Sequence, residues 1–222
     1  MARDFPGNVA NRFDIGDVAS VDITGTALSI ACWFFMDTAL SFAVIVNKGG
    51  SGAATQYTMG VNSSSIFASI GDGAGEDLFS AGTVSTGVWT HLCFVKAGTG
   101  ANAHRMYING SRTNNTSSRS IQNSATGLRI GCSTGGTLPI DGKLGELGIW
   151  SDSLTDDEVT SLVRGFSPRL IRPQSLALFM PMLEDSGNGI DLRHGVTATL
   201  SGTLAAADHP RIIMPSEAIY TP

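Results

Sequence analysis

The amino-acid sequence predicts an all-β protein with one short helix, and three observations lead to this fold class. Apolar segments of strand length recur along the chain, separated by glycine-rich or Asn-Gly turns. Glycine is abundant, with 27 residues, while charged residues make up only 15% of the chain, which suits many strands joined by tight turns. Only the segment from Ser151 to Phe166 carries clear helix signals. A length of 222 residues suits one large all-β domain or two small ones, built as a sandwich or a barrel.

The most apolar segment, ALSIACWFFM, predicts a strand that is covered on both sides. By alternation, Leu28 and Phe34 fall on one face and Trp33 falls on the other, and both faces are apolar. The segment VWTHLCFVK predicts another strand, in which Phe94 alternates with Trp89. We therefore expect Trp33, Trp89 and Phe94 to be mostly buried and to belong to the core.

Two local signals predict a hairpin and a helix. The segment HRMYINGS ends in Asn109-Gly110, a dipeptide typical of two-residue hairpin turns. In SDSLTDDEVTSLVRGF, Thr155 can be the N-cap and Glu158 stands three residues later, which is a capping box. Gly165 can close the helix in a left-handed conformation. We predict one helix near residues 155–164.

Composition argues against several kinds of partner. A net charge of −5 and a pI near 5.2 indicate no nucleic-acid partner, because phosphate binding needs a basic face. No apolar run is long enough to span a bilayer, so we expect no membrane insertion. The first residues, MARDFPGNVANRFDIGD, do not read as a signal peptide. Cys32, Cys93 and Cys132 fit no metal spacing. Cys32 and Cys93 lie in apolar strands, so we expect them to be buried free thiols in a chain made in a reducing cytoplasm.

Several segments, taken in order, resemble laminin-G-like domains. The opening DFPGNVANRFDIGD resembles their first strand pair, and LSIACWF resembles the second strand, which ends in Trp33. GVWTHLCFVKAG resembles a Trp-x-His strand through Trp89 and His91. DGKLGELGIWSDSLTDDEV resembles the segment that leads from a strand into a Leu-Ser/Thr-x-x-Glu helix. LALFMPMLEDSGNGIDLRHG resembles the closing strand and its turn.

This resemblance implies a two-sheet antiparallel jelly-roll sandwich of the concanavalin A-like lectin/glucanase superfamily, with the short helix before the last strands. It divides the chain into a laminin-G-like jelly-roll domain, residues 1–202, and an extended C-terminal arm, residues 203–222. The chain departs from the family at Gly145, before Glu146, where an Asp is frequent. Gly145 has no side chain that could take over the role of that Asp.

The superfamily includes glycoside hydrolases, but the sequence predicts a non-enzymatic protein. Such enzymes need two carboxylates that flank the sugar bond, and strand-borne carboxylates of one site stand on alternate residues. Glu146 is alone in its strand, and the adjacent Glu76 and Asp77 point to opposite faces if they are extended. No Gly-x-Ser-x-Gly nucleophile motif is present either. We predict no catalytic residue, and a degenerate glycanase is the third of three hypotheses.

A calcium-assisted carbohydrate-binding lectin module is the second hypothesis. Asp185, Asn188 and Asp191 in EDSGNGID are the candidate calcium ligands, and calcium is the only cofactor considered. The competing interpretation, which we favour, is a polar turn in which Asp185 and Asn188 bond their own backbone. Sugar binding also needs an exposed aromatic ring, for which Tyr57 and Phe79 remain once the tryptophans are assigned to the core.

The last segment, RIIMPSEAIYTP, predicts an assembly arm, because it is apolar and interrupted by proline. The arm residues are Ile212, Ile213, Met214, Ile219 and Tyr220. A laminin-G-like domain with free cysteines, such an arm and no secretion signal resembles virion proteins of tailed bacteriophages. The first hypothesis is therefore a structural or decoration protein, made in the host cytoplasm and located in the virion. Its expected partners are other virion proteins, copies of itself and surface glycans.

Overall fold

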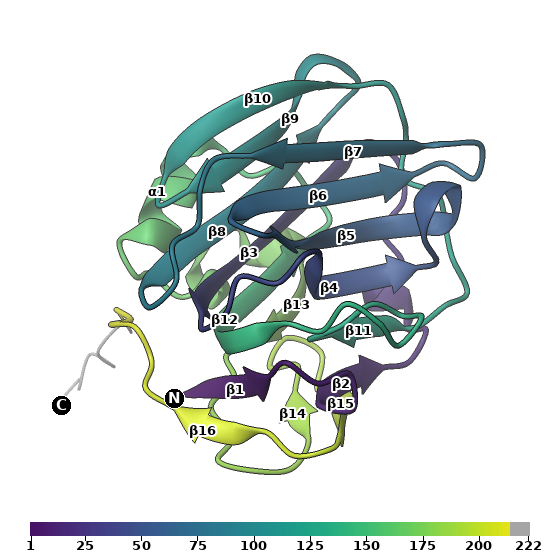
Figure 1. The fold of residues 1–222 in the computed structure, drawn as a ribbon. Helices are drawn as coiled ribbons and strands as arrows, with labels where there is room; N and C mark the ends of the chain where they lie inside the picture. Colours follow the sequence, from purple (N-terminus) through teal and green to yellow (C-terminus); the bar gives the residue numbers. More distant parts are fainter. Residues whose placement is uncertain (214–222) are drawn as a thin grey trace, which may run out of the picture.

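The computed structural model describes residues 1–213 and shows two sheets packed face to face (Figure 1). These residues form sixteen strands and one α-helix. The strand pairings within both sheets are antiparallel. The predicted all-β jelly-roll sandwich with one short helix is confirmed. No helix in this part of the chain is long and apolar enough to cross a membrane.

Sheet A contains eight strands in the order β10-β9-β8-β3-β12-β1-β16, and β13 also pairs with β12. Its strands are β1 (Ala2–Pro6), β3 (Ala27–Met36), β8 (Trp89–Ala97), β9 (Gly100–Ile108), β10 (Ser111–Ser117), β12 (Asp141–Trp150), β13 (Leu176–Met180) and β16 (Ala205–Ala207). The first part of β12 pairs with β1 and the second part with β13. An irregularity between Gly145 and Gly148 separates the two parts of β12.

Sheet B also contains eight strands, in the order β14-β15-β2-β11-β4-β5-β6-β7. Its strands are β2 (Arg12–Ile15), β4 (Ala43–Gly49), β5 (Thr55–Asn62), β6 (Ser65–Gly71), β7 (Glu76–Ala81), β11 (Leu128–Ile130), β14 (Gly189–Ile190) and β15 (Thr197–Ser201). Figure 1 shows β4 to β7 in front of β3, β8 and β12 of sheet A. Asp77 of β7 links the two sheet edges, because its carboxylate accepts hydrogen bonds from Ser117 Oγ (2.9 Å) and Ser118 N (2.7 Å) at the end of β10.

The main core lies between the two sheets and is built by alternation along the strands. Leu28 and Phe34 of β3 and Phe94 of β8 face inward from sheet A and are buried. Tyr57 and Phe79 face them from sheet B. Cys32, Cys93 and Cys132 are buried free thiols, as the sequence predicts for Cys32 and Cys93.

A second, smaller core lies on the outer face of sheet A, beneath the helix α1 (Asp156–Val163). Val159 and Leu162 of α1 pack there with Trp150 of β12, which is fully buried. The indole Nε1 of Trp150 donates to the carbonyl of Ile171 at 2.8 Å, so the buried N–H has a partner. The helix therefore covers one part of this face.

The helix and the hairpin form as their sequence signals predict. The Thr155 hydroxyl accepts from the Glu158 amide, and the Glu158 carboxylate accepts from the Thr155 amide at 2.8 Å, which completes the capping box. Gly165 ends the helix with a φ of +93°. Asn109 and Gly110 both have positive φ in the turn between β9 and β10, as a type I′ turn requires.

The core assignment of two tryptophans is wrong. Trp33 of β3 and Trp89 of β8 lie outside both core clusters, and each ring stays partly exposed. They occupy the outer face of sheet A, where α1 packs over Cys93 and Val95 of β8 but not over Trp89. Phe94, on the inner face, is buried as predicted.

The chain does not leave the jelly roll at the boundary predicted after residue 202. β16 pairs with β1, with Ala207 opposite Ala2, and so extends sheet A by one strand. Further on, the Ile213 amide donates to the Gly165 carbonyl at 2.6 Å, just after the helix. Figure 1 shows β16 beside β1 at the lower edge of the molecule. The described part of the predicted arm thus runs along its own domain.

The predicted arm residues divide between two parts of the chain. Ile212 is partly exposed, and Ile213 is exposed beside Phe166. Met214, Ile219 and Tyr220 lie outside the described residues. Docking of the arm on a partner stays a prediction.

Candidate functional site

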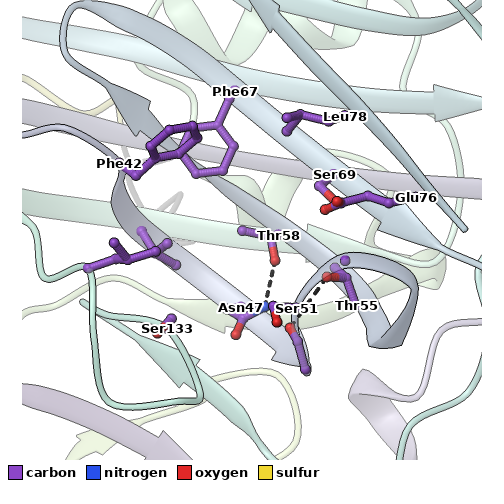
Figure 2. Close-up of a pocket in the computed structure, with 14 residues that line it drawn as sticks. Phe42, Asn47, Ser51, Thr55, Thr58, Phe67, Ser69, Glu76, Leu78 and Ser133 are labelled. Atoms are coloured by element: carbon purple, nitrogen blue, oxygen red, sulfur yellow. Dashed lines mark hydrogen bonds between the residues drawn. The ribbon is translucent and has the colours of Figure 1, made fainter.

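A groove crosses the outer face of sheet B, over strands β4 to β7 (Figure 2). Its volume is about 250 Å³. The lining residues are Phe42, Val44, Asn47, Gly50, Ser51, Gly52, Thr55, Thr58, Phe67, Ser69, Glu76, Leu78, Ser133 and Leu138. The only α-helix of residues 1–213 packs on the other sheet, so this face stays open to ligands.

The apolar end of the groove is formed by aromatic and aliphatic side chains. The rings of Phe42 and Phe67 meet edge to face, with centroids 5.5 Å apart (Figure 2). Phe67 of β6 stands opposite Gly60 of β5, and a Cβ at Gly60 would lie 2.8 Å from the Phe67 ring. The glycine therefore lets this ring lie against the sheet. Leu78 of β7 adds an exposed aliphatic side chain.

Two residues of the apolar end are held in a strained backbone conformation. Phe42 and Leu138 have φ values of +54° and +56°, which bulky side chains rarely adopt. Their side chains are 39% and 41% exposed, so core burial does not offset this cost. A hydrogen bond of 3.0 Å from the Val44 amide to the Leu138 carbonyl ties the two loops together. Strain of this kind concentrates at binding sites, where it directs side chains toward a ligand.

The polar end of the groove is organised around Asn47 of β4. Its Nδ2 donates to Thr58 Oγ1 at 2.5 Å, and its Oδ1 accepts from both N and Oγ1 of Thr134 at 2.8 Å. Asn47 is almost fully buried, so these bonds hold the amide in one orientation. The hydroxyl groups around it are thereby placed before any ligand arrives.

Glu76 of β7 is the only carboxylate among the described residues that line the groove. Ser69 of β6 donates its hydroxyl to Glu76 Oε1. The neighbouring Asp77 points away from the groove, toward the end of β10, as alternation predicts. Burial alone would raise the pKa of Asp77, but hydrogen bonds from Ser117 and Ser118 lower it overall.

The groove can therefore bind an amphipathic ligand, but it does not offer the acid and nucleophile of a glycosidase. Its apolar end matches a non-polar ligand face, and its polar end supplies hydroxyl donors and carboxylate and amide acceptors. Glycoside hydrolysis by the usual route needs two carboxylates beside the bond. Glu76 alone can accept or orient hydroxyl groups.

The predicted calcium ligands do not converge in the described residues. The carboxylate of Asp191 is buried and accepts from the amides of Phe179 and Arg193, both at 2.9 Å. Asn188 Oδ1 accepts from the Leu200 amide at 2.9 Å, and Asp185 is exposed. Residues 1–213 contain no group of three His, Cys, Asp or Glu side chains that could hold a metal ion. Calcium binding stays a prediction.

The two residues that the sequence offered as an exposed aromatic ring for sugar binding, Tyr57 and Phe79, are wrong. The aromatic rings of the groove, Phe42 and Phe67, were not predicted from the sequence. Tyr57 and Phe79 both point into the main core and are buried. One signal for Phe67 is present in SIFASI, where Phe67 and Ser69 share a face opposite the apolar Ile66 and Ile70. A large ring beside a hydroxyl on the polar face of a strand indicates a surface role.

The protein is a jelly-roll sandwich in which one sheet face is open and carries a groove. Comparison with known protein families gives the same fold class. A laminin G family model, described as concanavalin A-like lectin/glucanases superfamily, matches residues 10–160. The chain belongs to this family, and the predicted resemblance to laminin-G-like domains is confirmed. No curated protein sequence matches the chain.

Solved structures show the same fold at low sequence identity. A Bacteroides ovatus protein described as a candidate carbohydrate-binding protein is 18% identical with a TM-score of 0.70, and the match covers 96% of this chain and 61% of that one. A heptameric pentraxin of Limulus polyphemus is 16% identical with a TM-score of 0.57, covering 92% and 94%. Domain 4 of an extracellular arabinanase of Geobacillus stearothermophilus, solved with arabinotriose, is 19% identical with a TM-score of 0.54, covering 73% and 76%. This chain thus spans less than two thirds of the Bacteroides protein.

Proposed function

We propose that this protein is a non-catalytic carbohydrate-binding module that holds its ligand in the groove of sheet B. The observation that carries the proposal is the pair Phe42 and Leu138, two exposed apolar residues held in strained conformations beside an ordered polar end. A sugar ring has one apolar face of C–H groups and a rim of hydroxyl groups. It therefore matches a groove that combines both kinds of surface.

The solved neighbours add support for this ligand class. The arabinanase domain was solved with arabinotriose, and the Bacteroides protein is described as a candidate carbohydrate-binding protein. Those findings belong to the neighbours, and the likeness to them concerns the fold. The single carboxylate of the groove supports the non-catalytic part of the proposal, since Glu76 has no second carboxylate beside it among the lining residues. It also supports binding over the degenerate-glycanase alternative.

A titration with neutral oligosaccharides tests the proposal. The probes are arabinotriose, cellotriose and xylotriose, followed by calorimetry with and without a chelator. We expect saturable binding of at least one probe, which Phe42→Ser and Asn47→Ala each weaken by about tenfold. Leu192→Ser is the matched control, because Leu192 is an exposed apolar residue outside the groove. Binding that survives Phe42→Ser unchanged, or no binding of any probe, would contradict the proposal.

Assembly in a phage virion is the second candidate function, and one observation favours it. Phe166 and Ile213 lie side by side and are 38% and 40% exposed, so two apolar side chains meet at the surface. Such patches suit contacts with another protein. Particle composition tests this role: a virion protein is expected at a fixed copy number on purified particles. Absence from particles would overturn it and leave the glycan proposal standing.

A further inference from the structure

A recess on the outer face of sheet A is larger than the groove of sheet B. Its volume is about 800 Å³. Phe35 of β3 and Trp89 of β8 line it together with Asp4, Lys143 and residues 206–209. None of these residues lines the groove, and they belong to the opposite sheet. The recess is therefore a separate feature with its own chemistry.

Its aromatic rings are fixed in place yet not covered. Phe35 and Trp89 meet edge to face, with centroids 5.7 Å apart and ring planes at 65°. The ring of His209 lies 6.4 Å from Trp89. Both Phe35 and Trp89 remain partly exposed, whereas Trp150 on the same sheet is fully buried beneath α1. A rigid, partly exposed aromatic ring binds a ligand at low entropic cost.

The polar groups around these rings leave free acceptors. Lys143 Nζ donates to both carboxylate oxygens of Asp37 at 2.7 Å and lies 4.3 Å from the centre of the Phe35 ring, so its charge is already compensated. Asp4 and Asp208 have no side-chain hydrogen bond to any residue of the described chain. Partial burial raises the pKa of the Asp4 carboxyl, while Lys143 opposes that change.

We propose that this recess is a second saccharide-binding site, which takes a neutral or amino sugar. The indole of Trp89 offers a surface for the C–H face of a sugar ring, and the carboxylates of Asp4 and Asp208 accept hydrogen bonds from its hydroxyl or amino groups. An acidic sugar is disfavoured, because it would meet the carboxylates of Asp4 and Asp208, while Lys143 is already paired with Asp37 and, of the described lining residues, only the amino terminus at Met1 adds an unpaired positive charge.

Two sites on opposite sheets would let one chain bind two sugar units at once. Binding at both faces of the sandwich increases the avidity for a surface or polymer that presents many copies of the ligand. The recess shares no lining residue with the groove, so ligand binding in the recess does not depend on ligand binding in the groove. The two proposals share only the class of ligand, so they can fail separately.

The indole N–H signals in a two-dimensional NMR spectrum test the recess directly. The probes are cellotriose, the glucosamine trimer and trigalacturonate, each up to about 10 mM. Trp89→Phe assigns the Trp89 signal, and the Trp150 signal reports that the fold is intact, because this ring is buried and bonded to Ile171. We expect saturable shifts of the Trp89 signal with cellotriose or the glucosamine trimer, and no shift with trigalacturonate.

Variants separate this site from the groove. Asp4→Asn and Trp89→Ala should each weaken binding at the recess by about tenfold. Val88→Ala, next to Trp89 but outside the recess, should not, and neither should Phe42→Ser in the groove. The proposal is overturned if no probe shifts the Trp89 signal, if trigalacturonate shifts it as strongly as the others, or if Asp4→Asn leaves the affinity unchanged.

Discussion

The outer faces of the two sheets differ in what covers them. On sheet A, α1 buries an apolar cluster around Trp150. Residues 205–207 pair with β1, and the chain then passes Gly145 of β12 and reaches Gly165 after α1. On sheet B, the described residues place no α-helix, and the face carries Asn47, Thr58 and Glu76 among its apolar residues. Alternation alone brings side chains to each outer face. The covering element decides whether that face becomes core or binding surface.

Trp150→Ala gives the largest expected effect in this comparison. The ring is fully buried beneath α1, so its removal should lower the free energy of unfolding by about 3–5 kcal/mol. Trp89→Ala, on the uncovered part of the same face, should cost less than about 2 kcal/mol. Urea unfolding of both variants measures the difference. Equal losses would show that Trp89 is a core residue after all.

The next largest expected effect is on the free energy of unfolding, and it depends on pH through the buried carboxylate of Glu146. Glu146 lies at the irregularity of β12 and has a φ of +52°. The residue is only 2% exposed, and its carboxylate oxygens have no hydrogen-bond partner among the described residues. His209 Nε2 lies 3.7 Å from its Oε1. Burial raises the pKa of Glu146 from 4.5 to about 7. The folded state therefore holds a proton that the unfolded state releases.

Glu146→Gln should stabilise the protein above neutral pH. Below about pH 4.5 the carboxyl is neutral in both states. Between about pH 4.5 and 7 the unfolded state releases the proton that the folded state keeps, so the folded state loses stability over this range, and the loss is complete above about pH 7. At pH 8 the variant should gain roughly 2–3 kcal/mol, and its stability should fall less between pH 5 and 8. Glu76→Gln, on the open face of sheet B, serves as the control and should change stability by less than about 0.5 kcal/mol. An unchanged pH profile in Glu146→Gln would contradict the burial argument.

Two truncations test whether the C-terminal segment stabilises the domain or serves in assembly. Removal of residues 208–222 takes away His209 and the hydrogen bond from Ile213 to Gly165, and should cost about 1–2 kcal/mol. If residues 214–222 serve only as an assembly arm, their removal alone should leave thermal unfolding of the monomer nearly unchanged. If the assembly hypothesis holds, this shorter truncation still reduces incorporation into particles or oligomers, measured by light scattering. Normal assembly without residues 214–222 would contradict that hypothesis.

Calcium should have the smallest effect. The Asp191 carboxylate already accepts hydrogen bonds from three backbone amides, so binding a cation there would require breaking these bonds. We expect thermal melts with calcium and with a chelator to coincide. A bound cation at a hundredfold excess over its dissociation constant would instead add about 2.7 kcal/mol. A stabilisation of that size, lost in Asp191→Asn, would restore the calcium-assisted lectin hypothesis.

Local features of this protein follow from the sequence alone. The capping box of Thr155 and Glu158, the turn at Asn109-Gly110 and the inner face of β3 depend on neighbouring residues and on alternation. The laminin-G-like segments in order also indicate the family. These features need no knowledge of which strands pair.

Only the tertiary structure decided where the ligand surfaces lie. The groove joins Phe42, Thr58, Ser69, Glu76 and Leu138, which come from four neighbouring strands or the loops beside them. The sequence predicts that Trp33 and Trp89 belong to the core, because their strands are apolar on both faces. In the structure both rings are partly exposed, because α1 leaves that part of sheet A uncovered. β16 pairs with β1 from the other end of the described chain. Such outcomes depend on contacts between distant segments, and alternation within one strand places a side chain on a face without determining what packs against it.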